Sequence, residues 1–191
     1  MGDSRVTLQD IVITHELLQR SGRPANPHVE KLALEEIAQM TPQGRDAILQ
    51  SLCRVGLRLC AGGSCGINLL EGSGESRHFR WAVIEGVFAP YKGGTGPFDH
   101  SPCGFVRAQN SPQLLSNSAR YFEWMQGIDI PVVESLILPL YKNKDEVIGT
   151  IWVVSHDAQR QFDAEDLRIM SLLSNHAAAA LKLHESLYKV G

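Results

Sequence analysis

The stretch around Cys103 holds the residue types and spacings in this sequence that most favour binding chemistry. It reads Asp99-His100-Ser101-Pro102-Cys103-Gly104. Ser101 is a preferred N-cap residue, and Pro102 suits the first helical position because the N–H that proline lacks would have no partner there. A short helix is therefore expected to begin after Ser101. The free N–H groups at this helix start favour the binding of an anion or a carbonyl oxygen, and Gly104 has no side chain to block the approach. The same helix start is expected to lower the pKa of the Cys103 thiol.

Side chains near this helix start extend the candidate site. Asp99 and His100 offer polar contacts, but they lack a third metal ligand at suitable spacing, so no metal site is expected. Cys103 has a simpler interpretation as a small buried residue, which we favour over a reactive thiol. Five aromatic residues are candidates for an aromatic pocket, and about half of them are expected to face a cavity while the rest belong to the core: Trp81, Tyr91, Phe98, Tyr121 and Trp124. The predicted ligand-binding residues are Trp81, Phe98, Asp99, His100, Ser101, Cys103, Gly104 and Tyr121.

Composition limits the classes of partner. The 191 residues carry a net charge of −3, which gives no electrostatic reason to expect nucleic acid or an anionic membrane as a partner. No apolar run approaches the roughly 20 residues that span a bilayer. The first ten residues show no signal peptide, so we expect a cytoplasmic protein with reduced cysteines. The four cysteines, at 53, 60, 65 and 103, match no zinc or redox spacing.

The first third of the chain is predicted to be helical. A first helix is expected over 6–20, and a second, capped by Asn26 and opened by Pro27, runs to Met40. Thr41-Pro42 repeats the cap-then-proline arrangement and is expected to open a third helix that ends near Leu59. We expect 1–41 to form a helical extension and 42–191 to form the main domain.

The middle of the chain changes to the period of β-strands. Residues 65–70 and 79–87 are expected to pair through a glycine-containing loop. The glycine-rich segment 88–98 has no period and is expected to be a functional or mobile loop. A brief strand, a helical turn and two strong strands are then predicted at 113–116, 121–125, 136–141 and 147–155. The last two form an antiparallel hairpin, and the second is apolar on both faces, which favours the middle of the sheet.

The last helix has the clearest start in the sequence. Asp163 is expected to be its N-cap, Asp166 to complete a capping box, and Phe162 and Leu167 to form a hydrophobic staple. No stop signal precedes about Lys189, and an apolar stripe this long suggests pairing with a partner helix in a homodimer. The element order predicts an α+β fold with helices on one sheet face. The loop and the short helix then cover the other face and leave room for a small molecule.

Several motifs make the chain similar to the GAF family, the small-molecule sensor domains of signalling proteins. They are Ser101-Pro102-Cys103-Gly104, residues 107–112, residues 136–141, residues 147–152 and residues 162–167. The resemblance covers about 45–183 and is strongest to the N-terminal GAF domains of bacterial multi-domain sensor histidine kinases in two-component systems. It implies a six-stranded antiparallel sheet, helices behind it, a loop-covered pocket in front, and dimerisation through the terminal helices.

Three subfamilies can be compared by residue. Asn143-Lys144, Phe162 and Asp166 match the signature of cyclic-nucleotide-binding members, but Leu167 replaces the final Glu, so Lys144 and Asp166 are expected only to brace the fold. Bilin-binding members attach pigment through a Cys-His pair, whereas Gly104 follows Cys103, which disfavours a covalent pigment. Free methionine sulfoxide reductases share a Cys-Gly motif. No cysteine follows Cys103, so a resolving partner would have to be one of the three earlier cysteines: Cys53, Cys60 or Cys65.

These observations favour a non-enzymatic sensory module that binds a small molecule and signals through paired terminal helices. His176 stands in no phospho-acceptor motif and no kinase core is present. Two alternatives stay open: a thiol-dependent reductase that uses Cys103, and a sensor that holds a tetrapyrrole or haem-type chromophore. The sequence identifies no cofactor and does not name the ligand.

Overall fold

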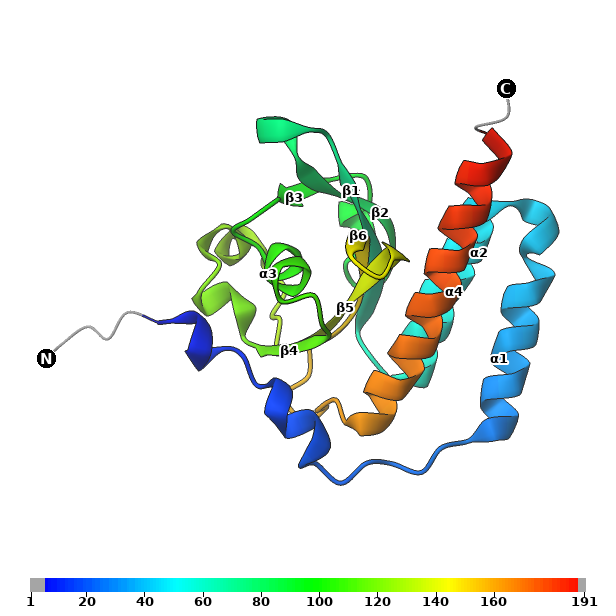
Figure 1. The fold of residues 1–191 in the computed structure, drawn as a ribbon. Helices are drawn as coiled ribbons and strands as arrows, with labels where there is room; N and C mark the ends of the chain where they lie inside the picture. Colours follow the sequence, from blue (N-terminus) through cyan, green and yellow to red (C-terminus); the bar gives the residue numbers. More distant parts are fainter. Residues whose placement is uncertain (1–5, 189–191) are drawn as a thin grey trace, which may run out of the picture.

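Six strands form one antiparallel sheet in the order β3-β2-β1-β6-β5-β4 (Figure 1). The computed structural model describes the backbone of residues 6–188 and the side chains of residues 6–183. The strands are β1 (Ser64–Glu71), β2 (His78–Gly86), β3 (Thr95–Pro97), β4 (Gln113–Ser116), β5 (Glu134–Asn143) and β6 (Glu146–Ser155). The two long hairpins therefore meet at the central pair β1 and β6, as the apolar character of β6 predicts.

The four α-helices divide between the two faces of this sheet. They are α1 (Pro27–Gln39), α2 (Arg45–Leu59), α3 (Pro102–Gln109) and α4 (Ala164–Tyr188). Helices α2 and α4 pack on one face, and α1 packs against α2 as an outer layer (Figure 1). Helix α3 lies against β5 and β6 on the other face, together with short 3₁₀ turns. The α+β prediction, with long helices on one face and the short helix on the other, is confirmed.

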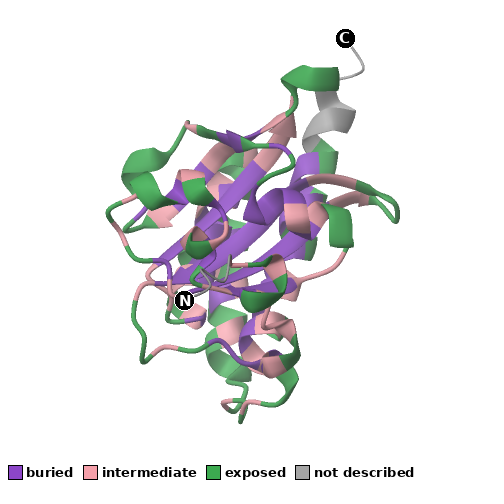
Figure 2. Ribbon diagram, turned by 90° about the vertical axis from the view of Figure 1, so that its left-hand side faces the viewer, coloured by how far each residue is buried: buried purple, intermediate pink, exposed green. Residues whose placement is uncertain are grey.

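Alternation along the strands produces two separate cores. Ile67, Ile151 and Val153 point towards α2 and α4 and join Leu173 in what we call the helix-side core. Their neighbour Trp152 points the other way, into the cavity-side core, which also contains Phe79, Val106, Ile137 and Cys103. Figure 2 shows the buried residues gathered in the sheet and on the element faces turned towards it.

The prediction of one helix over residues 6–20 is wrong. The segment forms two 3₁₀ turns, η1 (Leu8–Asp10) and η2 (Thr14–Leu18). Between them the chain runs beside β4, with an isolated bridge from Val12 to Leu115. The N–H of Ser116 donates to the carbonyl oxygen of Ile11 at 2.8 Å, and Ile11 is fully buried. The free edge of β4 offers hydrogen bonds and burial that outweigh the helical pattern of the segment.

Ion pairs fasten this N-terminal segment to the main body. Arg20 donates to both carboxylate oxygens of Glu134, at 3.0 and 2.7 Å, and to the carbonyl oxygen of Phe162 at 2.7 Å. Three residues on, Arg23 pairs with Asp166 at 2.5 Å. Glu134 and Asp166 are both buried, so these contacts lie in a low-dielectric setting.

Two other boundaries differ from expectation. Thr41-Pro42 opens only the 3₁₀ turn η3 (Thr41–Gln43), and α2 begins after Gly44, whose φ of 92° breaks the helical path. The segment 88–98 is not an aperiodic loop, because it contains the turn η5 (Ala89–Tyr91) and the edge strand β3, which pairs with β2. Two more turns, η6 (Ser118–Arg120) and η7 (Glu123–Gly127), lie on either side of Tyr121 and Phe122, so only the second part of the helical turn expected at 121–125 is helical.

The start of α4 is confirmed in atomic detail. The N–H of Asp166 donates to Asp163 at 3.0 Å, and the N–H of Asp163 donates back to Asp166 at 2.9 Å. This reciprocal pair is the predicted capping box. The expected end near Lys189 lies outside the described residues. Among the described helices, none has the length and apolar character needed to cross a membrane.

Candidate functional site

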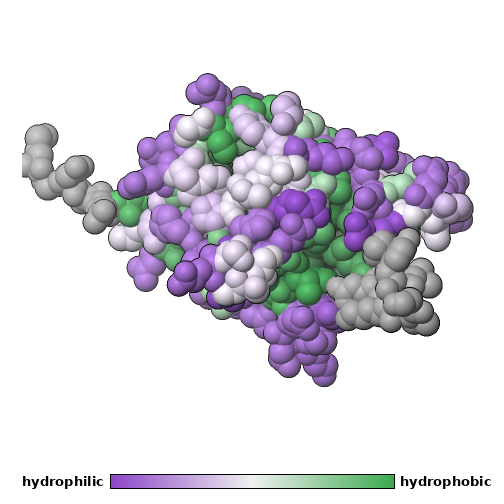
Figure 3. All heavy atoms as spheres, turned by 90° about the horizontal axis from the view of Figure 1, so that it is seen from above, coloured by the Kyte–Doolittle hydropathy of each residue, from purple (hydrophilic) through white to green (hydrophobic). Residues whose placement is uncertain are grey.

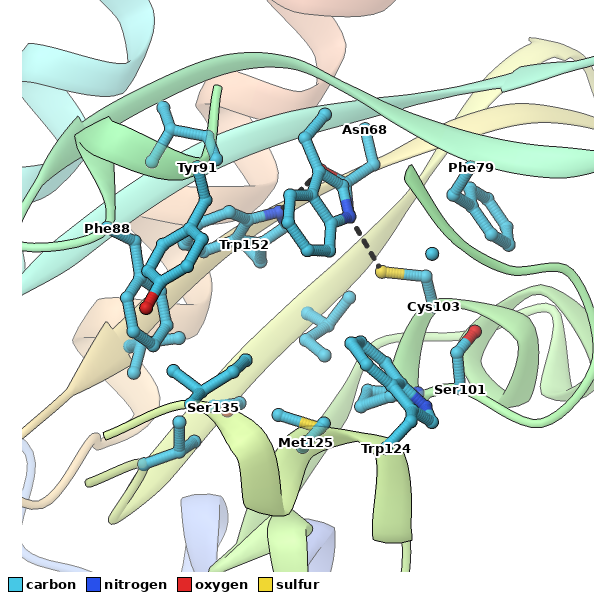
Figure 4. A pocket seen from close by; sticks show the side chains of 18 residues that line it. Asn68, Phe79, Phe88, Tyr91, Ser101, Cys103, Trp124, Met125, Ser135 and Trp152 are labelled. Carbon is cyan, nitrogen blue, oxygen red and sulfur yellow. Dashed lines mark hydrogen bonds between the residues drawn. The ribbon is translucent and has the colours of Figure 1, made fainter. Parts of the chain in front are cut away.

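A partly enclosed cavity of about 90 Å³ lies between the sheet and the cover formed by α3, η5 and η7 (Figure 4). Strands β1, β2, β5 and β6 supply its floor. Its lining residues are Asn68, Phe79, Trp81, Ile84, Phe88, Tyr91, Gly96, Ser101, Pro102, Cys103, Trp124, Met125, Ile128, Val132, Ser135, Ile137, Trp152 and Val154. The cavity therefore occupies the place predicted for a ligand, between the sheet and the short helix.

Aromatic rings form most of the wall. The rings of Trp81 and Trp124 stack with centroids 6.4 Å apart. Phe88 meets Tyr91 edge to face at 5.8 Å and Trp152 at 6.4 Å. All three tryptophans of the chain line the cavity. Rings in these arrangements offer flat apolar surfaces on more than one side of a guest molecule.

A short polar chain lies beside Cys103. The indole N–H of Trp152 donates to Oδ1 of Asn68 at 3.1 Å. An indole nitrogen only donates, so this bond orients the Asn68 amide and turns its Nδ2 towards Cys103. The Cys103 sulfur accepts from Asn68 Nδ2 and from the hydroxyl of Thr150, each at 3.2 Å, and Figure 4 shows the first of these bonds.

The start of α3 differs from the open helix end predicted from the sequence. Ser101 is the N-cap, as expected, and its Oγ accepts the N–H of Gly104 at 3.0 Å. The N–H of Phe105 donates to the Ser101 carbonyl oxygen. A Cβ on Gly104 would collide with the carbonyl oxygens of Phe98 and Asp99. Gly104 is therefore needed for the close approach of its own loop, and its N–H is not free for a ligand.

The expectation of an acidic Cys103 thiol is also wrong. Burial raises the pKa of this thiol, and the hydrogen bonds from Thr150 and Asn68 offset the rise only in part. Desolvation disfavours the thiolate more than the two donors favour it. Cys103 is thus a neutral thiol in the cavity wall near neutral pH.

Three of the eight predicted ligand-binding residues line the cavity, and the others lie outside the lining. The three are Trp81, Ser101 and Cys103. Phe98 stacks on Phe79 at 6.3 Å and lies beneath the guanidinium of Arg107. Asp99 is exposed and pairs with Arg107 at 3.4 Å. The remaining residues outside the lining are His100, Tyr121 and Gly104.

His100 and Tyr121 pack against each other above the cavity, with ring centroids 5.5 Å apart. His100 contributes to the site through its backbone and not through its side chain, because its carbonyl oxygen accepts a hydrogen bond from the indole N–H of Trp124 at 2.9 Å. His100 therefore orients a lining residue without facing the cavity itself.

The floor of the cavity is what sequence reasoning missed. Asn68, Ser135 and Trp152 reach the cavity because strand alternation and the antiparallel register place them on one face. Asn68, a polar residue within the otherwise apolar run 65–70, was the one signal for this face in the sequence. The pairing register itself depends on contacts between distant segments.

No lining residue of this cavity carries a charged side chain. Asp99 and Arg107, which lie before and after the lining residues of α3, pair with each other instead. Burying an unpaired ionic group is costly, so a cavity of this composition disfavours a charged guest.

The other three cysteines lie away from Cys103. Cys53, Cys60 and Cys65 are fully buried in the helix-side core, whereas Cys103 belongs to the cavity-side core. The sheet separates the two sets. Among the residues that the structure describes, no group of three potential metal ligands comes together.

The bracing role expected of Asp166 is present, and its partners are two arginines. Asp166 pairs with Arg23 at 2.5 Å and with Arg160 at 2.6 Å. Lys144 is exposed in the β5–β6 turn. Of the two residues expected to brace the fold, Asp166 does so through buried ion pairs, whereas Lys144 lies at the surface.

Solved structures with the same fold come from several kinds of protein. The GAF domain of an Acinetobacter phosphoenolpyruvate-protein phosphotransferase has a TM-score of 0.66 at 14% identity and covers 85% of this chain and 97% of its own. The second GAF domain of DevS from Mycobacterium smegmatis has a TM-score of 0.61 at 20% identity and covers 75% of this chain and 96% of its own. These identities establish the fold alone.

A third structure of this fold is an enzyme. The free methionine-R-sulfoxide reductase from Neisseria meningitidis, solved with its substrate, has a TM-score of 0.63 at 17% identity and covers 84% of this chain and 88% of its own. A comparison with curated protein sequences finds no match. A family model described as the GAF domain matches residues 42–182, and the chain therefore belongs to the GAF domain family.

Proposed function

We propose that this chain is a sensory module whose cavity binds a small, neutral, mainly apolar molecule. The observation that carries the proposal is the composition of the cavity wall, which contains no charged side chain. Six of its side chains are aromatic: Phe79, Trp81, Phe88, Tyr91, Trp124 and Trp152. Apolar walls with a few polar groups are the usual composition of small-molecule sites. The GAF fold, which serves as a sensor in signalling proteins, supports the same assignment.

The wall composition also argues against several ligand classes. Cyclic nucleotides and free amino acids carry ionic groups that would enter the cavity without a partner of opposite charge. The capped start of α3 provides no substitute, because Ser101 already occupies the N–H of Gly104. A neutral ligand avoids this desolvation cost.

The chromophore alternative has less support than a small ligand. Cavities for drug-sized ligands measure about 300–1,000 Å³, whereas this one measures about 90 Å³. A tetrapyrrole would require the cover to move, and the carboxylates typical of such pigments would find no cation in the lining. A guest about the size of a single ring agrees better with the volume.

The reductase alternative lacks a second thiol near the first. Cys103 has the three other cysteines on the opposite side of the sheet. Burial holds the Cys103 pKa above its usual range, which disfavours the nucleophilic thiolate. We therefore propose a binding module and not an enzyme.

Signal transfer is proposed to run through the sheet to the helices. Thr150 and Trp152 point to the cavity side of the sheet, where they donate hydrogen bonds to Cys103 and Asn68. Their neighbours Ile151 and Val153 lie in the helix-side core beside α2 and α4. A ligand shifts the helices only if it binds two arrangements with different affinity. We propose that the output is a homodimer paired through terminal helices, in a cytoplasmic protein associated with a two-component histidine kinase.

Titration with a matched pair of small aromatic probes tests the proposed ligand class. Neutral 4-fluorotoluene should change the tryptophan emission, because all three tryptophans line the cavity, and should broaden its own ¹⁹F signal. The anion 4-fluorobenzoate, of similar size, should do neither. Preferential binding of the benzoate, or no binding of either probe, would overturn the proposal. Native mass spectrometry of the purified protein supplies an independent search for a retained small molecule.

A further inference from the structure

One hydroxyl in the cavity wall has no partner. Ser135 lies on β5, is only 3% exposed and lines the cavity. Among the described residues its hydroxyl has no hydrogen-bond partner, and unlike the hydroxyls of Ser51 and Ser118 it is not fully enclosed by protein atoms, which agrees with its place in the cavity lining (Figure 4). A hydroxyl that faces an apolar cavity without a protein partner gains a hydrogen bond when a ligand brings a complementary group.

The register of β5 explains why this hydroxyl faces the cavity. Leu136, the next residue, belongs to the helix-side core, so Ser135 and Ile137 point to the cavity side. The cross-strand partner of Ser135 is Val154, which is also a lining residue. Ser135 is thus a single polar group in an apolar part of the wall.

Other polar groups of the wall are already engaged or reach water. The Ser101 hydroxyl donates to the Pro97 carbonyl oxygen at 2.6 Å and accepts from Gly104. Asn68 uses both ends of its amide, towards Trp152 and Cys103. Tyr91 is 36% exposed, so water can satisfy its hydroxyl at the rim. Ser135 is the buried lining hydroxyl that is left without a partner.

Ser135 on the floor and Cys103 on the cover lie towards opposite ends of the cavity. The Cys103 sulfur contacts Thr150, while Ser135 lies across from Val154, four residues further along β6. At roughly 3.3 Å per strand residue, this separates the two ends by about 13 Å. A guest that reaches Ser135 therefore places its polar group at the end away from the Asn68–Cys103 chain.

We propose that the cavity recognises a neutral aromatic alcohol of the phenol class, whose oxygen hydrogen-bonds to the Ser135 hydroxyl while its ring lies among the aromatic side chains. This inference rests on the proposed function, because it specifies the ligand of the same cavity. A serine hydroxyl both donates and accepts, so it suits a phenolic oxygen in either role. Protonated amines and carboxylates are disfavoured, since the lining offers no opposite charge.

The test compares 4-fluorophenol with 4-fluorotoluene, which differ only by a hydroxyl in place of a methyl group. In the wild-type protein the phenol should bind about three- to tenfold more tightly, as expected for one net hydrogen bond. Ser135→Ala should abolish this preference and leave the toluene affinity nearly unchanged. Ser135→Thr keeps the hydroxyl and should retain the preference. Affinities come from ¹⁹F line widths and tryptophan emission.

Ser51→Ala is the matched control. Ser51 is a buried serine whose hydroxyl also lacks a partner among the described residues, but that hydroxyl is enclosed by protein atoms, and Ser51 lies on α2, on the helix side of the sheet. This variant should bind both probes as the wild type does. A phenol preference that survives in Ser135→Ala, or equal binding of the two probes to the wild type, would overturn the inference and leave the cavity proposal standing. Failure of both probes to bind the wild type would overturn both proposals. Should Ser135→Ala not fold, the wild-type comparison and Ser135→Thr still decide.

Discussion

Cys103 lies at the start of α3, yet its surroundings oppose ionisation. A helix start favours a thiolate, but here Ser101 caps the first turn and the thiol is buried. The pKa of Cys103 is raised by burial, with hydrogen bonds from Thr150 and Asn68 as the smaller, opposite effect. Cys103, although cysteine is a reactive residue type, is therefore an uncharged thiol in the cavity wall.

We predict that Cys103 reacts slowly with iodoacetamide in the folded protein. A raised pKa leaves less thiolate at about pH 8, and each pKa unit removes roughly a factor of ten in thiolate. Alkylation should be at least about tenfold slower than in urea-unfolded chains, and the folded rate should rise only at higher pH than in the unfolded chain. Peptide mapping by mass spectrometry measures the modification at each cysteine. Equal rates in the folded and unfolded protein would contradict the prediction.

The segment before α1 belongs structurally to the body of the domain. It lies along β4 through Ile11 and Val12, and Arg20 then pairs with the buried Glu134. Glu134 also accepts the N–H of Phe162 at 2.8 Å, immediately before the cap of α4. One carboxylate therefore joins the N-terminal segment, β5 and the start of α4.

We predict that Arg20→Ala destabilises the protein by about 3–5 kcal/mol, because it leaves the Glu134 carboxylate buried without a cation. The Glu134 side chain is 5% exposed and the Arg20 side chain is 14% exposed. Urea denaturation measures the change in the free energy of unfolding.

Arg58→Ala supplies the control for this prediction. Arg58 pairs with Glu36, but the two side chains are 52% and 39% exposed. Loss of such a surface pair should cost no more than about 0.5–1 kcal/mol. Equal effects of the Arg20 and Arg58 variants would show that the Glu134 contact does not hold the N-terminal segment.

Helix α4 has side chains both in the buried core and on the solvent-exposed surface of the molecule. Leu173 is 1% exposed and packs against the sheet, whereas Leu183 is 66% exposed. Helix α1 adds Leu32, which is 51% exposed. Figure 3 shows hydrophobic surface open to solvent in the view from above. These exposed side chains support the proposed pairing of helices between two copies of the chain.

We predict that the wild-type protein sediments as a dimer and that Leu183→Glu shifts it towards the monomer. A carboxylate in an apolar helix contact would be desolvated without a partner, which weakens association. Val87→Glu is the control. Val87 is 49% exposed, and its N–H donates to Gly63 near the end of α2, away from the end of α4. A monomeric wild type, or an unchanged Leu183→Glu dimer, would contradict the pairing.

Most of the elements and the fold class could be predicted from local patterns in the amino-acid sequence. Asp163 and Asp166 predict their own capping box, and the apolar run 147–155 predicts a central strand, because caps and alternation depend on residues close together in the chain. The sequence alone also indicated a site between the sheet and the helix that Ser101 caps.

The side chains that form that site could not be predicted in this way, because they come from distant parts of the chain. Ser135, Asn68 and Trp152 share the cavity floor because three strands pair in one register, and that pairing depends on contacts between distant segments. The same packing buried Cys103, occupied the Gly104 N–H and drew residues 11–13 onto the edge of β4. Local patterns predict where an element begins, but burial and the neighbours brought by the fold decide what its side chains can do.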